Sequence, residues 1–439
     1  MINYKTTKFK QTSLGPIPEE WEVLDLGGCL EAVIDYRGKT PRKLGGNWSN
    51  SGYRAFSARN IENGQVKNEN SINFIDKQLY KKWMKIEIKR GDILLTSEGP
   101  LGQYYYWDSD EKIVLSQRLF GLRAKKETID SSYLYQYIKS PIFQSEIKNR
   151  ETGTTVTGIR QTELLKTRVI VPPLPEQTRI ASILSSFDSK IELNRQMNKT
   201  LEEIASTIFK RWFVDFEFPN EHGEPYKSSG GKMVESELGM MPEGWRVGPV
   251  NDLIQVESGF PFSSSIFDEN GSYGLVTIKN VQDGVFVSEC ANRIDTIPEK
   301  MPNYCKLAAG NILLSLTGNV GRICIVTGDN FVLNQRVAVL NPIDKISRGF
   351  TYLLFRQKDF QNNLIGIARG TAQQNLSPID TARLEIIIPS GYILAQFGQI
   401  ANPIFEALIS NLNQINVLSH LRDSLLPRLM SGRIRVTKW

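Results

Sequence analysis

The sequence predicts an α+β protein in which two tandem domains of mixed strand and helix are separated by two long coiled-coil helices. Three observations predict this fold class. The chain contains a long internal duplication, it has short apolar runs bounded by Gly, Pro and Asn, and it has two long stretches with a seven-residue apolar repeat. With 439 residues, 40% of them hydrophobic, the chain is long enough to build a core in each domain.

The duplication has a period of more than two hundred residues. LGPIPEEWEV begins at Leu14, and LGMMPEGWRV begins at Leu238, 224 residues later. Further along, GDILLTSEGPLGQ is echoed by GNILLSLTGNVGR after 219 residues, and VLSQR by VLNQR after 218. A unit of this length that occurs twice excludes a short-period solenoid and predicts a pseudo-dimer on one polypeptide.

Five segments follow one another along the chain. They are a first domain (1–173), a first long helix (174–216), a polar linker rich in Gly, Pro and Ser (217–237), a second domain (238–391), and a second long helix with a C-terminal tail (392–439). Runs such as DILLTS, RVIVPP, NILLSL, ICIVTG and LEIIIP predict strands inside the domains. One helical stretch is predicted from Ser132 to Asn149, with a counterpart that starts at Tyr352.

The two long helices carry a seam of apolar residues interrupted by asparagine. No Pro or Gly occurs from Glu176 to Phe213, and the seven-residue repeat recurs after the second domain. A polar seam residue fixes helix register at a cost in stability. We therefore predict that these helices pair antiparallel with each other, which gives a pseudo-two-fold relation, or pair with defined partner helices; they could also be simple core helices of their own domains. The predicted pairing residues are Asn194, Asn198, Leu201, Asn411 and Leu418.

Charge is distributed unevenly between the two halves. The net charge is +6, but residues 1–173 contain 27 Lys and Arg against 20 Asp and Glu, whereas residues 238–391 contain 13 against 14. A basic first domain permits a nucleic-acid partner, and the nearly neutral second domain cannot be assigned one from bulk charge.

The parts of an active site or metal site are not visible in the sequence. The two histidines, His222 and His420, cannot supply a clustered site, and the GKT beginning at Gly38 lacks the earlier glycine of a phosphate-binding loop. The NPIF beginning at Asn402 lacks the second proline of the NPP-aromatic motif of amino-methyltransferases, and no glycine-rich cofactor loop accompanies it. We therefore predict a chain without catalytic residues and without bound metal.

The expected location is the cytoplasm. The four cysteines show no CxxC pair, which is typical of reduced core residues. No apolar stretch approaches the roughly 18 residues of a membrane helix, so no membrane association is expected.

Several motifs in their order resemble the DNA-specificity subunit of Type I restriction-modification systems. In the first half these are LGPIPEEW, VIVPPLPEQTRIASILSSFD and IFKRWFVDFEF; in the second they are LGMMPEGW, GTAQQNLS, IIIPSGYILAQFGQIANPIF and SLLPRLMSGRI. The resemblance covers essentially the whole chain. The second half departs from it at residues 389–396, where PSGYILAQ replaces the expected PPLPEQ.

The resemblance implies that each domain is a target-recognition domain reading one half of a split, asymmetric double-stranded DNA sequence. It implies that the long helices set the gap between the halves and dock two modification (methyltransferase) subunits, and that restriction (motor-nuclease) subunits join the complex. No cofactor is expected in this chain; S-adenosylmethionine, ATP and Mg are expected on the partner subunits. Two alternatives stay open: a non-catalytic protein-protein scaffold that does not bind DNA, and a self-contained DNA-modifying enzyme.

Direct readout needs Arg, Lys, Asn and Gln side chains on loops, with further cations on phosphates. The predicted DNA-binding residues of the first domain are Arg37, Lys39, Arg42, Lys43, Asn47, Arg59, Gln103 and Tyr104. Those of the second domain are Ser263, Ser264, Lys279, Asn280, Asn319, Arg322, Arg369, Gln373 and Gln374. The Gln-Arg pairs at 117–118 and 335–336 recur at matching positions, which favours a shared structural role for them.

Overall fold

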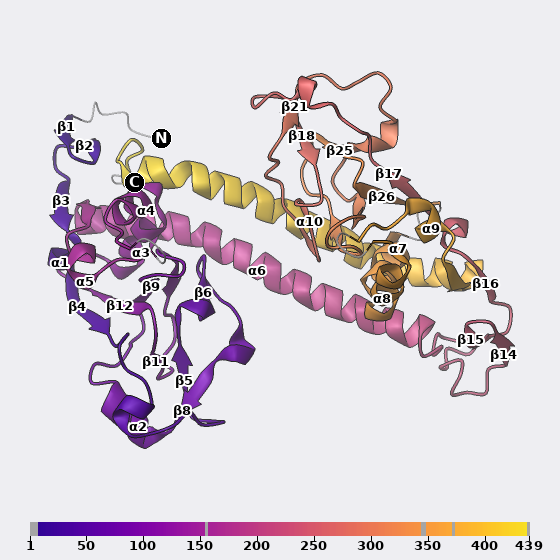
Figure 1. Ribbon diagram of the computed structural model, residues 1–439, viewed down its shortest axis with the longest axis horizontal. Coiled ribbons are helices and arrows are strands. Elements are labelled where there is room, and N and C mark those ends of the chain that lie inside the picture. The colour runs from indigo at the N-terminus through magenta and orange to yellow at the C-terminus, as the bar shows by residue number, and fades with distance from the viewer. Residues whose placement is uncertain (1–7, 154–156, 344–347, 371–373, 437–439) are drawn as a thin grey trace. The chain divides into compact units, whose positions relative to one another are not determined.

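The computed structural model describes residues 8–153, 157–343, 348–370 and 374–436, which form two compact units. Unit 1 comprises the described residues of 1–189 and 419–439, and unit 2 comprises those of 190–418. Two helices of 40 residues, α6 (Leu174–Phe213) and α10 (Gly391–Met430), contribute residues to both units (Figure 1). The predicted fold class, two tandem α+β domains with two long helices, is confirmed.

Unit 1 is built around a four-stranded antiparallel sheet. Its order is β10 (Tyr104–Tyr106), β9 (Ile93–Thr96), β12 (Leu119–Ala124), β4 (Leu30–Asp35). A second sheet has the order β11 (Val114–Leu115), β5 (Tyr53–Phe56), β8 (Asn73–Ile75), with β11 and β5 parallel. Three two-stranded pairs complete the unit: β1 (Phe9–Thr12) with β2 (Gly15–Pro18), β3 (Glu22–Asp25) with β13 (Arg168–Val171), and β6 (Ile61–Glu62) with β7 (Gln65–Val66).

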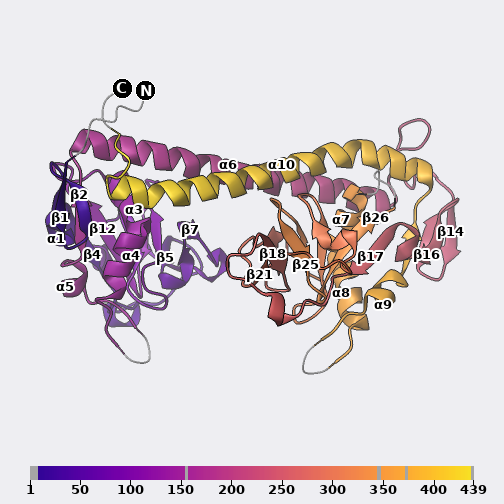
Figure 2. The same ribbon diagram turned by 90° about the horizontal axis from the view of Figure 1, so that it is seen from above.

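Five short helices are described in unit 1. They are α1 (Leu26–Cys29), α2 (Lys77–Trp83), α3 (Ser131–Lys139), α4 (Pro141–Lys148) and α5 (Gln161–Leu164), of which α3 packs on the four-stranded sheet. The sequence predicted one helix across α3 and α4. Ser140 ends α3 and caps α4, because Pro141 lacks the N–H that a continuous helix needs at that point. Gln136 of α3 donates to Asp188 of α6 at 2.8 Å, and Figure 2 shows α3 next to the C-terminal turns of α10.

Unit 2 repeats the order of the four-stranded antiparallel sheet of unit 1, and its second sheet has one strand more than that of unit 1. Its antiparallel sheet runs β24 (Ile323–Ile325), β23 (Ile312–Ser315), β26 (Val337–Pro342), β17 (Ile254–Ser258), and the second runs β21 (Arg293–Ile294), β18 (Tyr273–Val276), β25 (Phe331–Leu333), β22 (Lys306–Leu307). The two-stranded pairs are β14 (Met233–Ser236) with β15 (Gly239–Pro242), β16 (Arg246–Pro249) with β27 (Glu385–Ile388), and β19 (Val281–Gln282) with β20 (Val285–Phe286). The helices are α7 (Arg348–Arg356), α8 (Lys358–Ile367) and α9 (Pro378–Ala382). The five apolar runs predicted as strands are β9, β13, β23, β24 and β27.

The segment 217–237, expected to be a linker, contributes to the core of unit 2. Phe218 is buried and stacks on Trp245, with ring centroids 5.1 Å apart, and Tyr226 stacks on the same Phe218 at 4.6 Å. Trp245 belongs to the LGMMPEGW repeat, so the second copy of this motif anchors the chain that follows α6.

The first copy of the motif anchors the beginning of α6 in a different way. Trp21 is buried and its indole N–H donates to the Glu176 carboxylate at 3.0 Å, and Arg435 donates to the same carboxylate at 2.9 Å. Gln177 donates to the Pro172 carbonyl at 2.7 Å. In the second half, where this Glu-Gln pair is absent, α10 still begins at Gly391, and the Ser390 hydroxyl accepts from the Ile393 N–H at 3.4 Å.

The two long helices pair antiparallel inside each unit. In unit 2, Asn411 donates to the Asn198 carbonyl oxygen at 2.9 Å, and Asn194 donates to Gln414 at 3.2 Å. All three asparagines are buried, while Leu201 and Leu418 are half-buried. In unit 1 the two long helices are joined by the ion pair between Asp188 and Arg422 at 2.9 Å, and Asp188 also contacts Lys139 of α3 at 2.6 Å.

Candidate nucleic-acid interface

The loop after β4 places the predicted basic residues of unit 1 in two different environments. Arg37 donates to both carboxylate oxygens of Asp35, at 2.9 and 2.8 Å, and its guanidinium lies 3.9 Å from the centre of the Phe120 ring. Its charge is therefore neutralised within the domain. Arg42 and Lys43, which belong to the short 3-10 turn Arg42–Leu44, are exposed to solvent, and the Lys43 ammonium donates to the Gly38 carbonyl at 2.9 Å.

Helix α2 packs directly beside this turn. The Lys39 ammonium donates to the Trp83 carbonyl at 2.9 Å, and the exposed Trp48, next to exposed Asn47, lies 6.2 Å from the Trp83 ring. Burial and the neighbouring Lys85 lower the pKa of Lys39. The loop and the helix thus form one surface.

Three lysines of α2, and Lys85 just after the helix, enlarge this surface, and the sequence reasoning missed them. Lys77, Lys81, Lys82 and Lys85 are all exposed. The run KKWMK could have indicated them, because Trp83 within it is buried and forces its neighbouring lysines outward. We call the seven cations of the loop and helix the basic surface: Lys39, Arg42, Lys43, Lys77, Lys81, Lys82 and Lys85.

The remaining candidates of unit 1 lie on the turns around β6 and β10. Arg59 is exposed, whereas Gln103 and Tyr104 are half-buried. The Gln103 side-chain oxygen accepts from the Asn63 N–H at 2.7 Å, and Tyr104 packs edge-on against Tyr135 with ring centroids 5.8 Å apart. Burial raises the pKa of the Tyr104 hydroxyl. Gln103 and Tyr104 are thus held by the domain itself.

Asn280 does not fit direct readout of DNA, because its side chain is hydrogen-bonded to backbone groups of the same domain. It is buried, its oxygen accepts from the Thr277 N–H at 2.9 Å, and its amide donates to Val287 and Glu289 carbonyls at 2.8 and 3.0 Å. Asn60 closes the equivalent turn of unit 1, accepting from the Ser57 N–H at 3.0 Å. The repeat therefore preserves a structural asparagine at this position.

Other candidates of unit 2 are exposed on loops. Ser263, Ser264 and Lys279 are exposed, as are Asn319 and Gln374. Gln373 lies outside the described residues.

Two arginines of unit 2 already have protein partners. Arg322 is half-buried and donates to Gln282. The exposed Arg369 contacts Asp380 at 3.4 Å, and its backbone pairs with that of Asn375.

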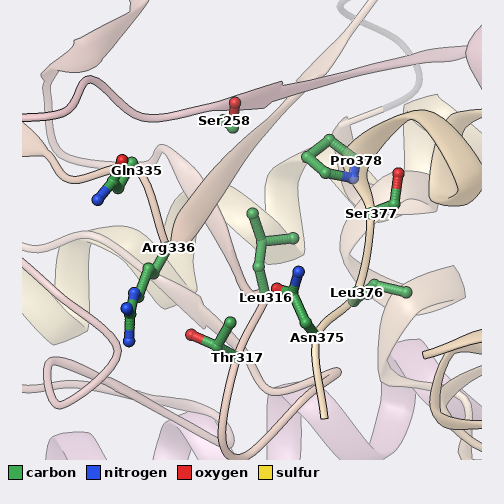
Figure 3. A pocket seen from close by; sticks show the side chains of 9 residues that line it. All are labelled: Ser258, Leu316, Thr317, Gln335, Arg336, Asn375, Leu376, Ser377 and Pro378. Carbon is green, nitrogen blue, oxygen red and sulfur yellow. The ribbon is translucent and has the colours of Figure 1, made fainter. Parts of the chain in front are cut away.

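A polar cleft of about 560 Å³ lies in unit 2 where the ends of β17, β23 and β26 meet the segment before α9 (Figure 3). Its lining offers guanidinium, amide and hydroxyl groups. The lining residues are Ser258, Leu316, Thr317, Gln335, Arg336, Asn375, Leu376, Ser377 and Pro378. Sequence reasoning included none of them among the candidate DNA contacts.

The cysteines sit in surroundings that suppress thiolate chemistry. Burial raises the pKa of Cys29, Cys290 and Cys305 to about 11 in each case. Within the described ranges, no group of three His, Cys, Asp or Glu side chains is arranged to hold a metal ion. In that same part of the chain, no helix combines the length and apolarity needed to cross a membrane.

Comparison with known proteins finds one family model that matches both copies of the duplication. The Type I restriction modification DNA specificity domain matches twice, over residues 18–203 and 242–417. The chain is 28% identical to the MjaIX specificity subunit, a Type I restriction enzyme subunit of Methanocaldococcus jannaschii, over 99% of both chains. It is 26% identical to the HindI specificity subunit of Haemophilus influenzae, over 80% of this chain and 88% of that one.

A solved structure has the same fold. The Type I restriction-modification S subunit from M. genitalium aligns over 97% of this chain and 98% of its own, with a TM-score of 0.56 at 16% identity. The two domain matches cover most of the chain, one in each sequence repeat. The chain therefore belongs to the Type I restriction-modification DNA-specificity family.

Proposed function

We propose that this chain is the specificity subunit of a Type I restriction-modification complex and reads a bipartite, asymmetric DNA sequence. The observation that carries the proposal is the double match of the DNA specificity domain, once on each repeat of the sequence. Two domains with the same strand order in the four-stranded antiparallel sheet and different surface residues suit a target with two unlike halves.

The basic surface supports DNA binding by unit 1. Exposed Lys and Arg side chains attract the phosphate backbone and release its counterions, which supplies affinity without sequence information. Unit 2 offers fewer exposed cations, so its share of binding relies more on hydrogen-bonding groups such as those of the polar cleft.

We infer a non-catalytic role for the chain, with methyl transfer and DNA cleavage carried out by partner subunits. Two modification subunits and the restriction subunits would bind S-adenosylmethionine, ATP and Mg. Exposed apolar residues on one face of α6 in unit 2, Leu193, Met197 and Ile204, support partner docking, because a partner would remove them from water. The family assignment favours this proposal over both a scaffold without DNA and a self-contained modifying enzyme.

Selection from a random duplex library tests DNA reading directly. The full chain, co-expressed with its modification subunit, is used to capture DNA, and the bound fragments are sequenced. The proposal predicts an enriched motif of two unlike halves at a fixed separation. Captured DNA without any enriched sequence would contradict it.

A further inference from the structure

The polar cleft of unit 2 occupies the place where unit 1 holds an internal ion pair. Strand register gives the correspondence, because Asp35 pairs with Phe120 in unit 1 and Ser258 pairs with Ala338 in unit 2. In unit 1 the Arg37 guanidinium covers Phe120 and bonds to Asp35. The smaller Ser258 and Ala338 cannot reproduce this arrangement.

Arg336 also differs from its counterpart Arg118 in electrostatic surroundings. Arg118 forms an ion pair with Glu98, with 3.2 Å between Nε and Oε1. Thr317 takes the place of Glu98 in unit 2, since Thr317 pairs with Asn375 as Glu98 pairs with Gly158. Within the described residues, Arg336 has no acidic partner and is exposed to solvent.

The Thr317 hydroxyl is a second unusual feature of the cleft. Thr317 is only 8% exposed, and its hydroxyl oxygen has no hydrogen-bond partner among the described residues. In Figure 3 this hydroxyl points toward the side of the cleft on which Arg336 lies. A buried hydroxyl without a partner is unfavourable, so a ligand that supplies a hydrogen bond there is stabilised.

We propose that this cleft receives base-pair edges of one DNA half-site and that Arg336 is a specificity-determining contact to a guanine. The proposal rests on the proposed function of the chain. An arginine without an internal partner can donate two parallel hydrogen bonds to the O6 and N7 of guanine, and Gln335 and Asn375 carry amides suited to adenine. Arg118, already bound to Glu98, is not available for this task.

The test compares variants of the full chain, co-expressed with the modification subunit, by selection from a random duplex library. Wild type is expected to enrich two half-sites, one of which contains a G·C pair. Arg336→Ala is expected to lose about tenfold to hundredfold discrimination at that pair and to leave the other half unchanged. Arg336→Lys keeps the charge and can still donate to guanine O6 and N7, but without the rigid planar fork, so discrimination at that position should fall less than in Arg336→Ala while the salt dependence of binding stays the same.

Two further variants make the test specific. Thr317→Glu recreates the Glu98–Arg118 pair of unit 1 and is expected to relax the position that Arg336→Ala relaxes. Arg118→Ala is the matched control and should leave both halves unchanged. Since Arg336 is exposed, thermal unfolding of its variants should match wild type.

The outcomes separate this inference from the proposed function. A two-part wild-type motif that Arg336→Ala and Arg336→Lys leave unaltered would overturn the role of Arg336 and keep the proposed function. A uniform loss of affinity without any relaxed position would also overturn it, because that marks a phosphate contact. No enriched wild-type sequence would overturn both.

Discussion

Neighbouring cations in one loop have different roles because of contacts that are remote in sequence. Arg37 is neutralised by Asp35 and lies on Phe120, which comes from another strand, whereas Arg42 is exposed. The sequence indicated both as basic loop residues, and it could not indicate the ring on which Arg37 lies. We therefore propose phosphate contact for Arg42 and Lys43, and a structural role for Arg37.

Removing the two exposed cations should weaken DNA binding through a purely electrostatic term. Arg42→Ala with Lys43→Ala is expected to reduce affinity equally for all sequences and to lower the slope of log K against log salt by about 0.9 for each phosphate that is no longer neutralised. The measurement is a salt titration of binding by fluorescence anisotropy. The matched control is Lys125→Ala with Lys126→Ala. These two exposed lysines follow β12 and lie near the first residue of β4, whereas Arg42 lies beyond the last residue of β4. Equal slopes for both double variants would disprove the placement.

The carboxylate of Asp188 lies between three donors, and its titration should make the stability of unit 1 fall at acid pH. Burial tends to raise the pKa of Asp188, but the contacts with Lys139, Gln136 and Arg422 outweigh it, so the net shift is downward. The folded pKa is then below the unfolded one. The resulting stabilisation is present above the ordinary Asp range near pH 4 and is lost as pH falls through the lower folded pKa.

Asp188→Asn removes this titration. Its unfolding midpoint is expected to be lower than that of wild type at pH 7, and the difference should shrink as the pH is reduced toward 3. Urea unfolding at several pH values, followed by circular dichroism, measures this. A difference between the two proteins that stays constant across the range would rule out the linkage.

At the scale of elements, the long helices were the most predictable part of the chain. Their apolar repeat is local; residues 174–216 were predicted as the first long helix, and α6 covers Leu174–Phe213. The break between α3 and α4 was missed because an apolar periodicity continues across Pro141, although the proline ends the hydrogen-bond ladder. Sheet order could not be predicted, since it depends on pairings such as β4 with β12 that join segments far apart in the chain.

The buried asparagine pair should show strong coupling. Asn198→Leu or Asn411→Leu alone leaves one buried amide without its partner and is expected to cost about 1–3 kcal/mol. The double replacement should be much less costly than the sum, because two apolar groups then meet in the seam. A double-mutant cycle by urea unfolding measures the coupling. Additive losses would contradict a direct contact between the two side chains.

At the scale of the whole molecule, two copies of one fold carry different surface residues. The duplication, the fold class and the family resemblance were all predictable, because the repeated motifs are structural: Trp21 anchors α6 and Trp245 anchors the chain after it. Asn280 was wrongly predicted as a DNA contact because it is a polar loop residue, whereas its recurrence with Asn60 reflects a shared turn. The polar cleft escaped prediction because the repeated motifs align Phe120 with Ala338, whereas only strand register aligns Asp35 with Ser258.

Mapping methylated adenines across host DNA tests the central proposal most directly. The chain is co-expressed with its modification subunit, and the DNA is read by single-molecule sequencing. The account predicts one split motif with two unlike halves separated by a constant gap, and a variant altered only in unit 2 should change one half alone. A continuous or symmetric motif, or a stable complex that leaves DNA unmodified at any defined sequence, would contradict two-domain recognition by this chain.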